Sequence, residues 1–286
     1  MSACLRRLPG CGAELELGPG QPGQPQLVDC SLSEADFALL QRGLREHRAL
    51  LVRGQEHLPL GGLDALCRRM GGSAYDPSEH GAELPDSDRS RSYLVTNVAD
   101  AATGRVREGE LVSGSAEAGS AGNHEWHTDY CWKPVINPVT MLLCRRFTCS
   151  QGGQTQLADT AAALNALPSS VRRRITGLET THGGVNFPAV RQPLIIESSL
   201  SHCPALLVGR HAKGVHGLGE VESAALLSEL NDHCTRPEFV CAPCIHYGCS
   251  TMPCPHRNRR STTPMRNRRP QPCSVACCMT GGRCKI

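Results

Sequence analysis

No stretch of this sequence approaches the ~18 consecutive apolar residues that a membrane-spanning helix needs. The N-terminal segment also lacks the apolar stretch of about 7–15 residues that secretory signals contain. Charged residues make up only 20% of the chain and apolar residues 40%, so a sizeable core can form. With 286 residues, the chain is long for one domain and short for two. We expect a soluble, cytoplasmic protein without a membrane or nucleic-acid partner, with an organellar location and a homo-oligomeric state left open.

Aspartate and glutamate are absent from residues 241–286, which contain eight Lys/Arg and eight of the 17 cysteines. Residues 1–240 contain 22 Lys/Arg and all 27 acidic residues, so this part is net acidic. Such a sharp change of composition indicates two differently built parts. We predict one domain over residues 5–240, incomplete at its C-terminus, and a Cys/Arg-rich tail over residues 241–286 that is disordered or out of frame.

The domain carries the mixed helix and strand signals of an α/β or α+β fold. Ser33 is a typical helix N-cap, and Phe37, Leu40 and Leu44 then recur at helical spacing. Residues 100–123 have no periodicity, and we predict a long loop that closes over a site as a lid. Further strands are expected at 49–52, 92–96, 139–143 and 206–208, and further helices at 63–70, 160–177 (with a second start at Pro168) and 220–234.

The segment His127-Thr128-Asp129 is the most informative part of the sequence. In an extended chain, residues i and i+2 point to the same side, so His127 and Asp129 can bind one metal ion. Two histidines and one carboxylate form the facial triad of non-haem Fe(II) oxygenases, which leaves coordination positions open. The pair alone is also compatible with a polar loop, or with a zinc site that includes His124, although catalytic zinc usually has three protein ligands.

Three motifs in order narrow these alternatives: Trp126-His127-Thr128-Asp129, Gly152-Gly153-Gln154-Thr155 and Pro237-Glu238-Phe239. With them, residues 5–240 resemble the TauD/TfdA family, the taurine dioxygenase-like enzymes that depend on Fe(II) and 2-oxoglutarate. The resemblance implies a double-stranded β-helix, a cupin-like jelly roll with flanking helices. It also implies that Fe(II), 2-oxoglutarate and O₂ are used to oxidise or hydroxylate a small organic substrate, such as a sulfonate-like anion, with release of succinate and CO₂.

The resemblance also assigns roles to individual residues. It makes His127 and Asp129 two of the three iron ligands at the catalytic centre. Thr155 matches the residue whose hydroxyl group helps to hold 2-oxoglutarate, and Asn123 matches a residue that lines the substrate pocket. The remaining histidines of the domain are expected to have surface or structural roles; among them are His182, His202, His211 and His216.

The tail departs from the family pattern, because the expected second histidine ligand and 2-oxoglutarate arginine are not clearly present. Residues 241–286 contain one aromatic residue and few branched aliphatic ones, so we expect an irregular segment that cannot complete the jelly roll. The first interpretation is translation out of frame. In the second, the tail preserves a remnant of the site: His256 is the third iron ligand, with His246 as a further candidate, and Arg268 binds 2-oxoglutarate.

A third interpretation makes the tail a zinc module. Four of its cysteines have loosely suitable spacing, although a second well-spaced pair is missing. If the tail supplies no iron ligand, the chain is a catalytically inactive, cupin-like binding or scaffold protein. Formation of succinate that depends on Fe(II) and 2-oxoglutarate separates the enzyme from this alternative. The four cysteines are Cys241, Cys244, Cys249 and Cys254.

Overall fold

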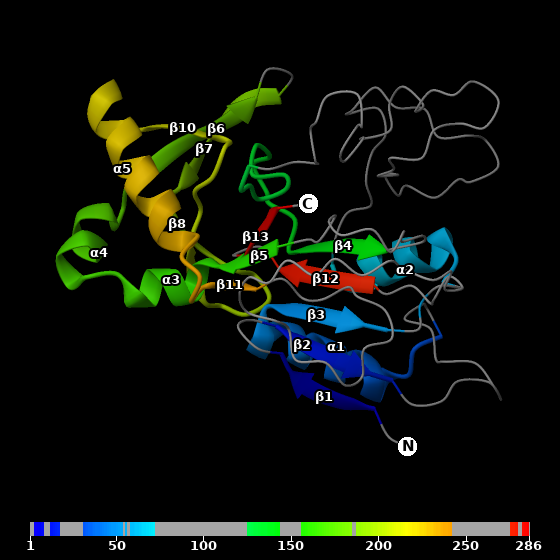
Figure 1. The fold of residues 1–286 in the computed structure, drawn as a ribbon. Coiled ribbons are helices and arrows are strands. Elements are labelled where there is room, and N and C mark those ends of the chain that lie inside the picture. Colours follow the sequence, from blue (N-terminus) through cyan, green and yellow to red (C-terminus); the bar gives the residue numbers. More distant parts are fainter. Residues whose placement is uncertain are drawn as a thin grey trace, which may run out of the picture.

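The computed structural model describes residues 3–8, 12–17, 31–53, 55, 58–71, 125–143, 156–184, 187–241, 275–279 and 282–285. Within these residues, helices and strands form two groups, each with its own apolar core. Figure 1 shows the first group around a five-stranded sheet near the N-terminus, and the second around the helices coloured green and yellow. None of the helices in the described part is long and apolar enough to cross a membrane.

The five-stranded sheet has the order β1-β2-β3-β12-β4 and is antiparallel except for the parallel pair of β2 and β3. Helix α1 packs against β2 and β3, and helix α2 packs against β4. The predicted helix start is confirmed, because the side chain of Ser33 accepts a hydrogen bond from the backbone N–H of Asp36 at 3.1 Å. The elements are β1 (Cys4–Arg7), β2 (Ala13–Glu16), α1 (Glu34–His47), β3 (Ala49–Val52), α2 (Leu60–Arg69), β4 (Val139–Leu143) and β12 (Val275–Met279).

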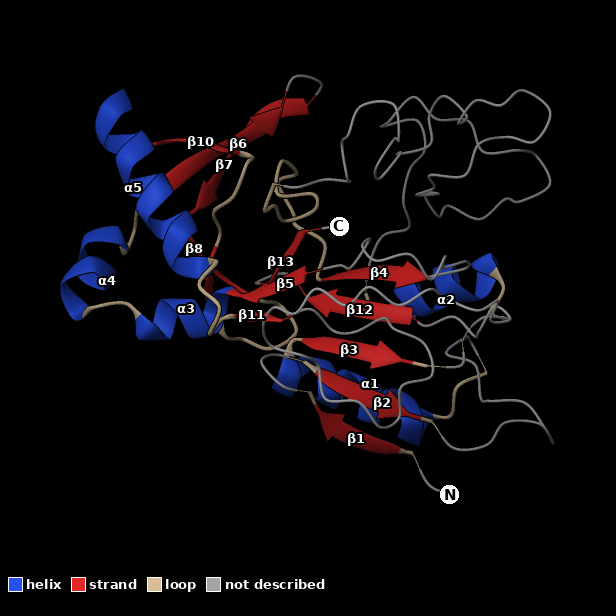
Figure 2. Ribbon diagram, in the orientation of Figure 1, coloured by secondary structure: helices blue, strands red, loops and turns tan. Residues whose placement is uncertain are grey.

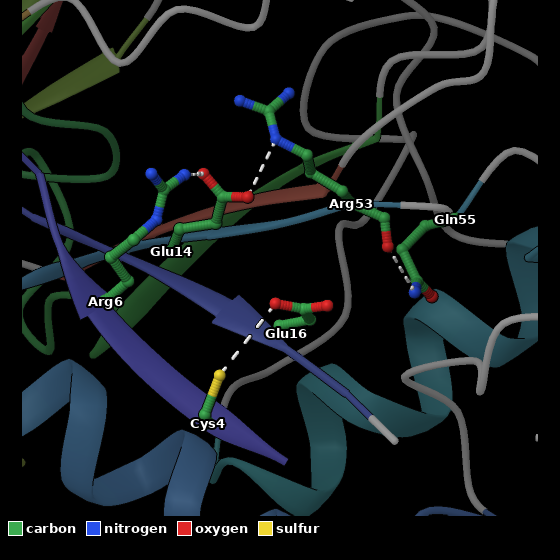
Figure 3. Close-up of polar contacts among 6 residues, drawn as sticks. All are labelled: Cys4, Arg6, Glu14, Glu16, Arg53 and Gln55. Atoms are coloured by element: carbon green, nitrogen blue, oxygen red, sulfur yellow. Dashed lines mark hydrogen bonds and ion pairs between the residues drawn. The ribbon is translucent and has the colours of Figure 1, made fainter. Parts of the chain in front are cut away.

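A carboxylate on β2 links the three N-terminal strands (Figure 3). Glu14 accepts hydrogen bonds from Arg6 at 2.8 Å and from Arg53 at 3.0 Å. Arg6 lies directly opposite Glu14 on β1, and Arg53 follows β3. The buried side chain of Gln55 donates to the backbone carbonyl of Arg53 at 3.0 Å, which fixes the chain after β3.

The second group contains α3, α4 and α5 together with three smaller sheets (Figure 2). These sheets have the orders β10-β6-β7, β11-β5-β13 and β8-β9. The predicted second helix start at Pro168 is confirmed, because α3 ends before it and α4 begins after it. The elements are β5 (Gln156–Asp159), α3 (Thr160–Ala166), α4 (Ser169–Ile175), β6 (Glu179–Gly184), β7 (Phe187–Pro193), β8 (Ile195–Glu197), β9 (Pro204–Leu206), β10 (Ala212–Val215), α5 (Glu220–Cys234), β11 (Val240–Cys241) and β13 (Gly282–Lys285).

A partly buried ion pair joins the two groups. Arg48, just after α1, donates from Nε to Asp159 Oδ2 at 2.9 Å, and its second nitrogen lies 2.7 Å from the same oxygen. The other carboxylate oxygen of Asp159 accepts the backbone N–H of Ala162 at 2.9 Å and so caps α3. One side chain therefore fixes both the start of a helix and the contact between the groups.

The expectation of an irregular tail is wrong for two segments. β12 lies in the five-stranded sheet between β3 and β4, and β13 pairs with β5. Residues 275–279 are five consecutive uncharged, mostly apolar residues, which suit a strand with neighbours on both sides. The prediction was based on the composition of the whole tail, which does not reflect this short apolar run. The expected strand at 92–96 and loop at 100–123 lie outside the described residues. Translation of the tail out of frame stays a prediction.

Candidate metal centre

His127 lies in the segment before β4 and its side chain is buried. Its Nδ1 atom is 2.9 Å from the backbone carbonyl of Glu125. Because a carbonyl can only accept a hydrogen bond, Nδ1 carries the proton and donates it. Nε2 is then the atom with a lone pair for a metal ion. This arrangement, with one ring nitrogen donating to a backbone carbonyl, is typical of histidines that bind metals.

Asp129 faces the second ring nitrogen of His127, with Oδ1 3.3 Å from Nε2. Its Oδ2 accepts a hydrogen bond from the hydroxyl group of Thr140 on β4 at 3.2 Å. Burial raises the pKa of the Asp129 carboxyl, but His127 lowers it when the ring also carries a proton on Nε2, through a hydrogen bond and a positive charge. The hydrogen bond from Thr140 lowers it further, so the pKa of Asp129 lies below its usual range. The carboxylate is therefore ionised at neutral pH and available as a ligand.

The donor set fits a metal ion. Bonds from a metal to histidine nitrogen or carboxylate oxygen are about 2.0–2.2 Å long. A nitrogen and an oxygen 3.3 Å apart can thus both contact one ion. Together with the hydrogen bond that orients the His127 ring, this makes the pair a candidate part of a metal site. The described residues contain no group of three His, Cys, Asp or Glu side chains that completes it.

His211 also lies at this centre, although the sequence suggested only a surface or structural role. Its side chain is 7% exposed, and its ring centroid is 6.3 Å from that of His127 and 4.8 Å from that of Trp132. Burial and the charge of Arg210 lower the pKa of His211 to about 4, so the ring is neutral at pH 7.

Aromatic and cationic side chains adjoin the pair. The ring centroids of Tyr130 and Trp132 are 5.6 Å apart, and the ammonium group of Lys133 lies 4.3 Å from the centre of the Tyr130 ring. Arg210 donates from Nε to Nε2 of His211 at 3.1 Å. Cys131 is buried, and its pKa is raised to about 12, so it stays a neutral thiol and is a poor metal ligand.

The structure thus brings together two of the predicted site residues, His127 and Asp129. The other candidates lie outside the described residues, and their roles stay predictions. Figure 1 shows the segment that carries the pair, in green, between the five-stranded sheet and the sheet of β6, β7 and β10. The candidates outside the described residues are Asn123, Thr155, His246, His256 and Arg268.

Comparison with known proteins gives the same assignment as the motifs. The alpha-ketoglutarate-dependent 2,4-dichlorophenoxyacetate dioxygenase of Cupriavidus pinatubonensis is 27% identical over 229 residues, which are 73% of this chain and 77% of that protein. A taurine dioxygenase from Burkholderia xenovorans has a similar fold, with a TM-score of 0.66 and 20% identity over 100% of this chain and 84% of that one. AAD-2, solved with Mn(II) and N-oxalylglycine, also has a TM-score of 0.66, with 17% identity over 100% of this chain and 90% of that one.

The family model described as "Taurine catabolism dioxygenase TauD, TfdA family" matches residues 14–243. This range contains most of the chain and includes both members of the candidate metal pair. It begins nine residues after the predicted domain start and ends close to the predicted boundary at residue 240. The chain therefore belongs to the TauD/TfdA family of dioxygenases.

Proposed function

We propose that His127 and Asp129 are two of the iron ligands of this enzyme and that His256 is the third. Membership of the family makes the chain a non-haem iron dioxygenase that uses 2-oxoglutarate, which is alpha-ketoglutarate, and O₂. One observation carries the ligand assignment. Nε2 of His127 lies 3.3 Å from Asp129 Oδ1, while Nδ1 of the same ring is engaged with the carbonyl of Glu125.

Bound iron and 2-oxoglutarate supply the oxidation of a substrate C–H bond by O₂, with succinate and CO₂ as the other products. The protein binds, orients and shields the reactants. Asp129 contributes a negative charge at neutral pH because its pKa is low. We assign to Thr155 and Arg268 the binding of the 2-oxoglutarate carboxylates, and to Asn123 a place beside the substrate. The jelly roll, as in cupins, is the proposed core that holds these residues together.

The proposed substrate is a small organic anion with an aromatic ring. Trp132 packs against His211 and Tyr130, Lys133 lies over the Tyr130 ring, and Arg210 donates to His211, so aromatic and positively charged side chains adjoin one another near the pair. An aromatic carboxylate matches both features, because rings stack on aromatic side chains and carboxylates pair with guanidinium groups. The names of two relatives, which act on 2,4-dichlorophenoxyacetate and phenoxypropionate, agree with this choice over a sulfonate such as taurine.

Succinate release tests the proposal. The full chain is incubated with Fe(II), 2-oxoglutarate and O₂, with 2,4-dichlorophenoxyacetate, phenoxyacetate or taurine as substrate. We expect the aryloxyacetates to stimulate succinate formation more than taurine does. Asp129→Ala removes a ligand and should abolish the signal. His202→Ala is the matched control, since the exposed His202 lies on the β8–β9 hairpin. A wild-type chain that releases no succinate supports the inactive, cupin-like alternative.

A further inference from the structure

We infer that Gly209 is a positioning residue for the iron ligand His127. This inference rests on the proposed iron site. Gly209 lies in the turn between β9 and β10, and its φ is +125°, a backbone conformation that side chains disfavour. A Cβ atom at this position would lie 2.8 Å from the carbonyl oxygen of Trp126 and 3.3 Å from Cα of His127. Both contacts are with backbone, so no side chain can rotate away to make room.

The turn is also hydrogen-bonded to the ligand segment, which runs from Glu125 to Asp129 and carries both proposed iron ligands. The backbone N–H of Arg210 donates to the carbonyl of Trp126 at 2.9 Å, the same oxygen that a Cβ at Gly209 would meet. The absence of a side chain at position 209 therefore lets the two backbones approach closely enough for this bond. Trp126 immediately precedes the proposed ligand, so this contact fixes the origin of the His127 side chain.

The other side of the turn is fixed to the second group of elements. Ala212 N–H donates to the Gly209 carbonyl at 3.0 Å, which closes the turn, and Gly183 N–H on β6 donates to the His211 carbonyl at 3.1 Å. The ligand segment is thus held to the sheet of β10, β6 and β7 through this turn. A bulkier residue at 209 must move either the turn or the backbone of His127.

Such a movement affects metal binding more than folding. Ligand distances in metal sites are usable within about 0.2 Å, whereas a Cβ contact of 2.8 Å requires a larger displacement to reach ordinary contact distance. Moving His127 changes the 3.3 Å separation between its Nε2 and Asp129 Oδ1. We therefore expect Gly209→Ala to lose more metal affinity than its loss of folding stability accounts for.

Gly177 provides a matched control. Its φ is +81°, so alanine is strained there as well, but a Cβ at Gly177 has no atom within 4 Å. Gly177→Ala and Gly209→Ala thus both place a side chain at a position with positive φ. Only the new Cβ of Gly209→Ala would clash with the ligand segment. We would measure thermal unfolding of the metal-free proteins and the affinity of each for Mn(II) alone, as a stand-in for Fe(II), by calorimetry.

We expect Gly209→Ala to bind Mn(II) at least about tenfold more weakly than the wild type, as variants of outer-shell partners do. Gly177→Ala should retain wild-type affinity. Equal Mn(II) affinity in Gly209→Ala and the wild type would overturn the inference while leaving the proposed iron site intact. Equal losses in both glycine variants would overturn it too. A wild-type chain that binds no Mn(II) overturns the iron site itself, and this inference with it.

A second pair of variants decides the question if Gly209→Ala does not fold. Arg210 is the second residue of the turn closed by Gly209 and Ala212, a position that favours proline. Arg210→Pro removes the N–H that bonds to Trp126, and Arg210→Ala keeps it. We expect weaker Mn(II) binding in the proline variant than in the alanine variant, and equal binding would refute the positioning role.

Discussion

The hydroxyl group of Thr140 offers the sharpest test of the proposed iron site, because it contacts the ligand Asp129 without contacting the metal position. It donates to Asp129 Oδ2 at 3.2 Å, while Oδ1 faces His127. Thr140→Val removes this donor and keeps the shape of the side chain. The carboxylate then has fewer hydrogen bonds to orient it and to stabilise its charge.

The expected loss can be estimated from the geometry. Loss of an outer-shell partner of a metal ligand costs about 10–100-fold in metal affinity. Since the side chain of Asp129 is 32% exposed, water can partly replace the lost donor, and we expect the lower end of this range. A tenfold loss corresponds to about 1.4 kcal/mol. The lost donor also raises the pKa of Asp129, so protons compete with the metal at higher pH than in the wild type.

The assay is a Mn(II) titration of the wild type, Thr140→Val and Thr140→Ser at pH 7 and at pH 5. Thr140→Ser keeps the hydroxyl group and should bind nearly as well as the wild type. The deficit of Thr140→Val should be larger at pH 5, where the carboxylate is closer to protonation. Wild-type affinity in Thr140→Val at both pH values would refute the reasoning, as would a serine variant that is as weak as the valine variant.

Three further predictions concern folding. The pKa of His211 is about 6.5 in the unfolded chain and about 4 in the folded protein, so the unfolded chain binds more protons between these two pH values. The metal-free protein should therefore lose about 3 kcal/mol of stability as pH falls through this window. In denaturant titrations, His211→Asn should reduce this dependence of stability on pH, and an unchanged dependence would contradict the burial of a neutral His211. Asp159→Ala removes the cap of α3 and the ion-pair partner of Arg48, so the free energy of unfolding in urea should fall by about 3 kcal/mol. A fall of less than about 1 kcal/mol would contradict the role of Asp159 as both helix cap and link between the two groups. Leu164→Ala, at a fully buried position, should cost about 2–5 kcal/mol, whereas Val221→Ala, at an 85% exposed one, should stay within about 0.5 kcal/mol.

The features that could be predicted from the sequence are those with local causes. The start of α1 depends on Ser33 and its near neighbours, and the strand at 49–52 on one apolar run. His127 and Asp129 are two residues apart, so a short extended segment is enough to place them together. These arrangements are determined within a few residues, and sequence patterns describe such distances well.

The features that could not be predicted depend on pairing between distant segments. His211 reaches His127 only because the turn after β9 is held to both β6 and Trp126. The place of β12 between β3 and β4 depends on strands from the first half of the chain, and the composition of the tail gave no indication of it. Long-range contacts of this kind leave no periodic trace in the sequence near the residues involved.

The candidate metal pair is held from both groups of elements at once. Thr140 contacts Asp129 from β4 of the five-stranded sheet, and the turn at Gly209 holds Trp126 from the sheet of β6, β7 and β10. Within the ligand segment itself, the carbonyl of Glu125 and the carboxylate of Asp129 contact the ring of His127. A His-x-Asp sequence elsewhere would offer the same two ligand side chains. It would lack both the hydrogen bond from Thr140 and the contact with the turn at Gly209. This explains why the motif alone is weak evidence for a metal site. It also implies that changes in either group, even far from the ligands, alter metal affinity when they shift the position of one group relative to the other.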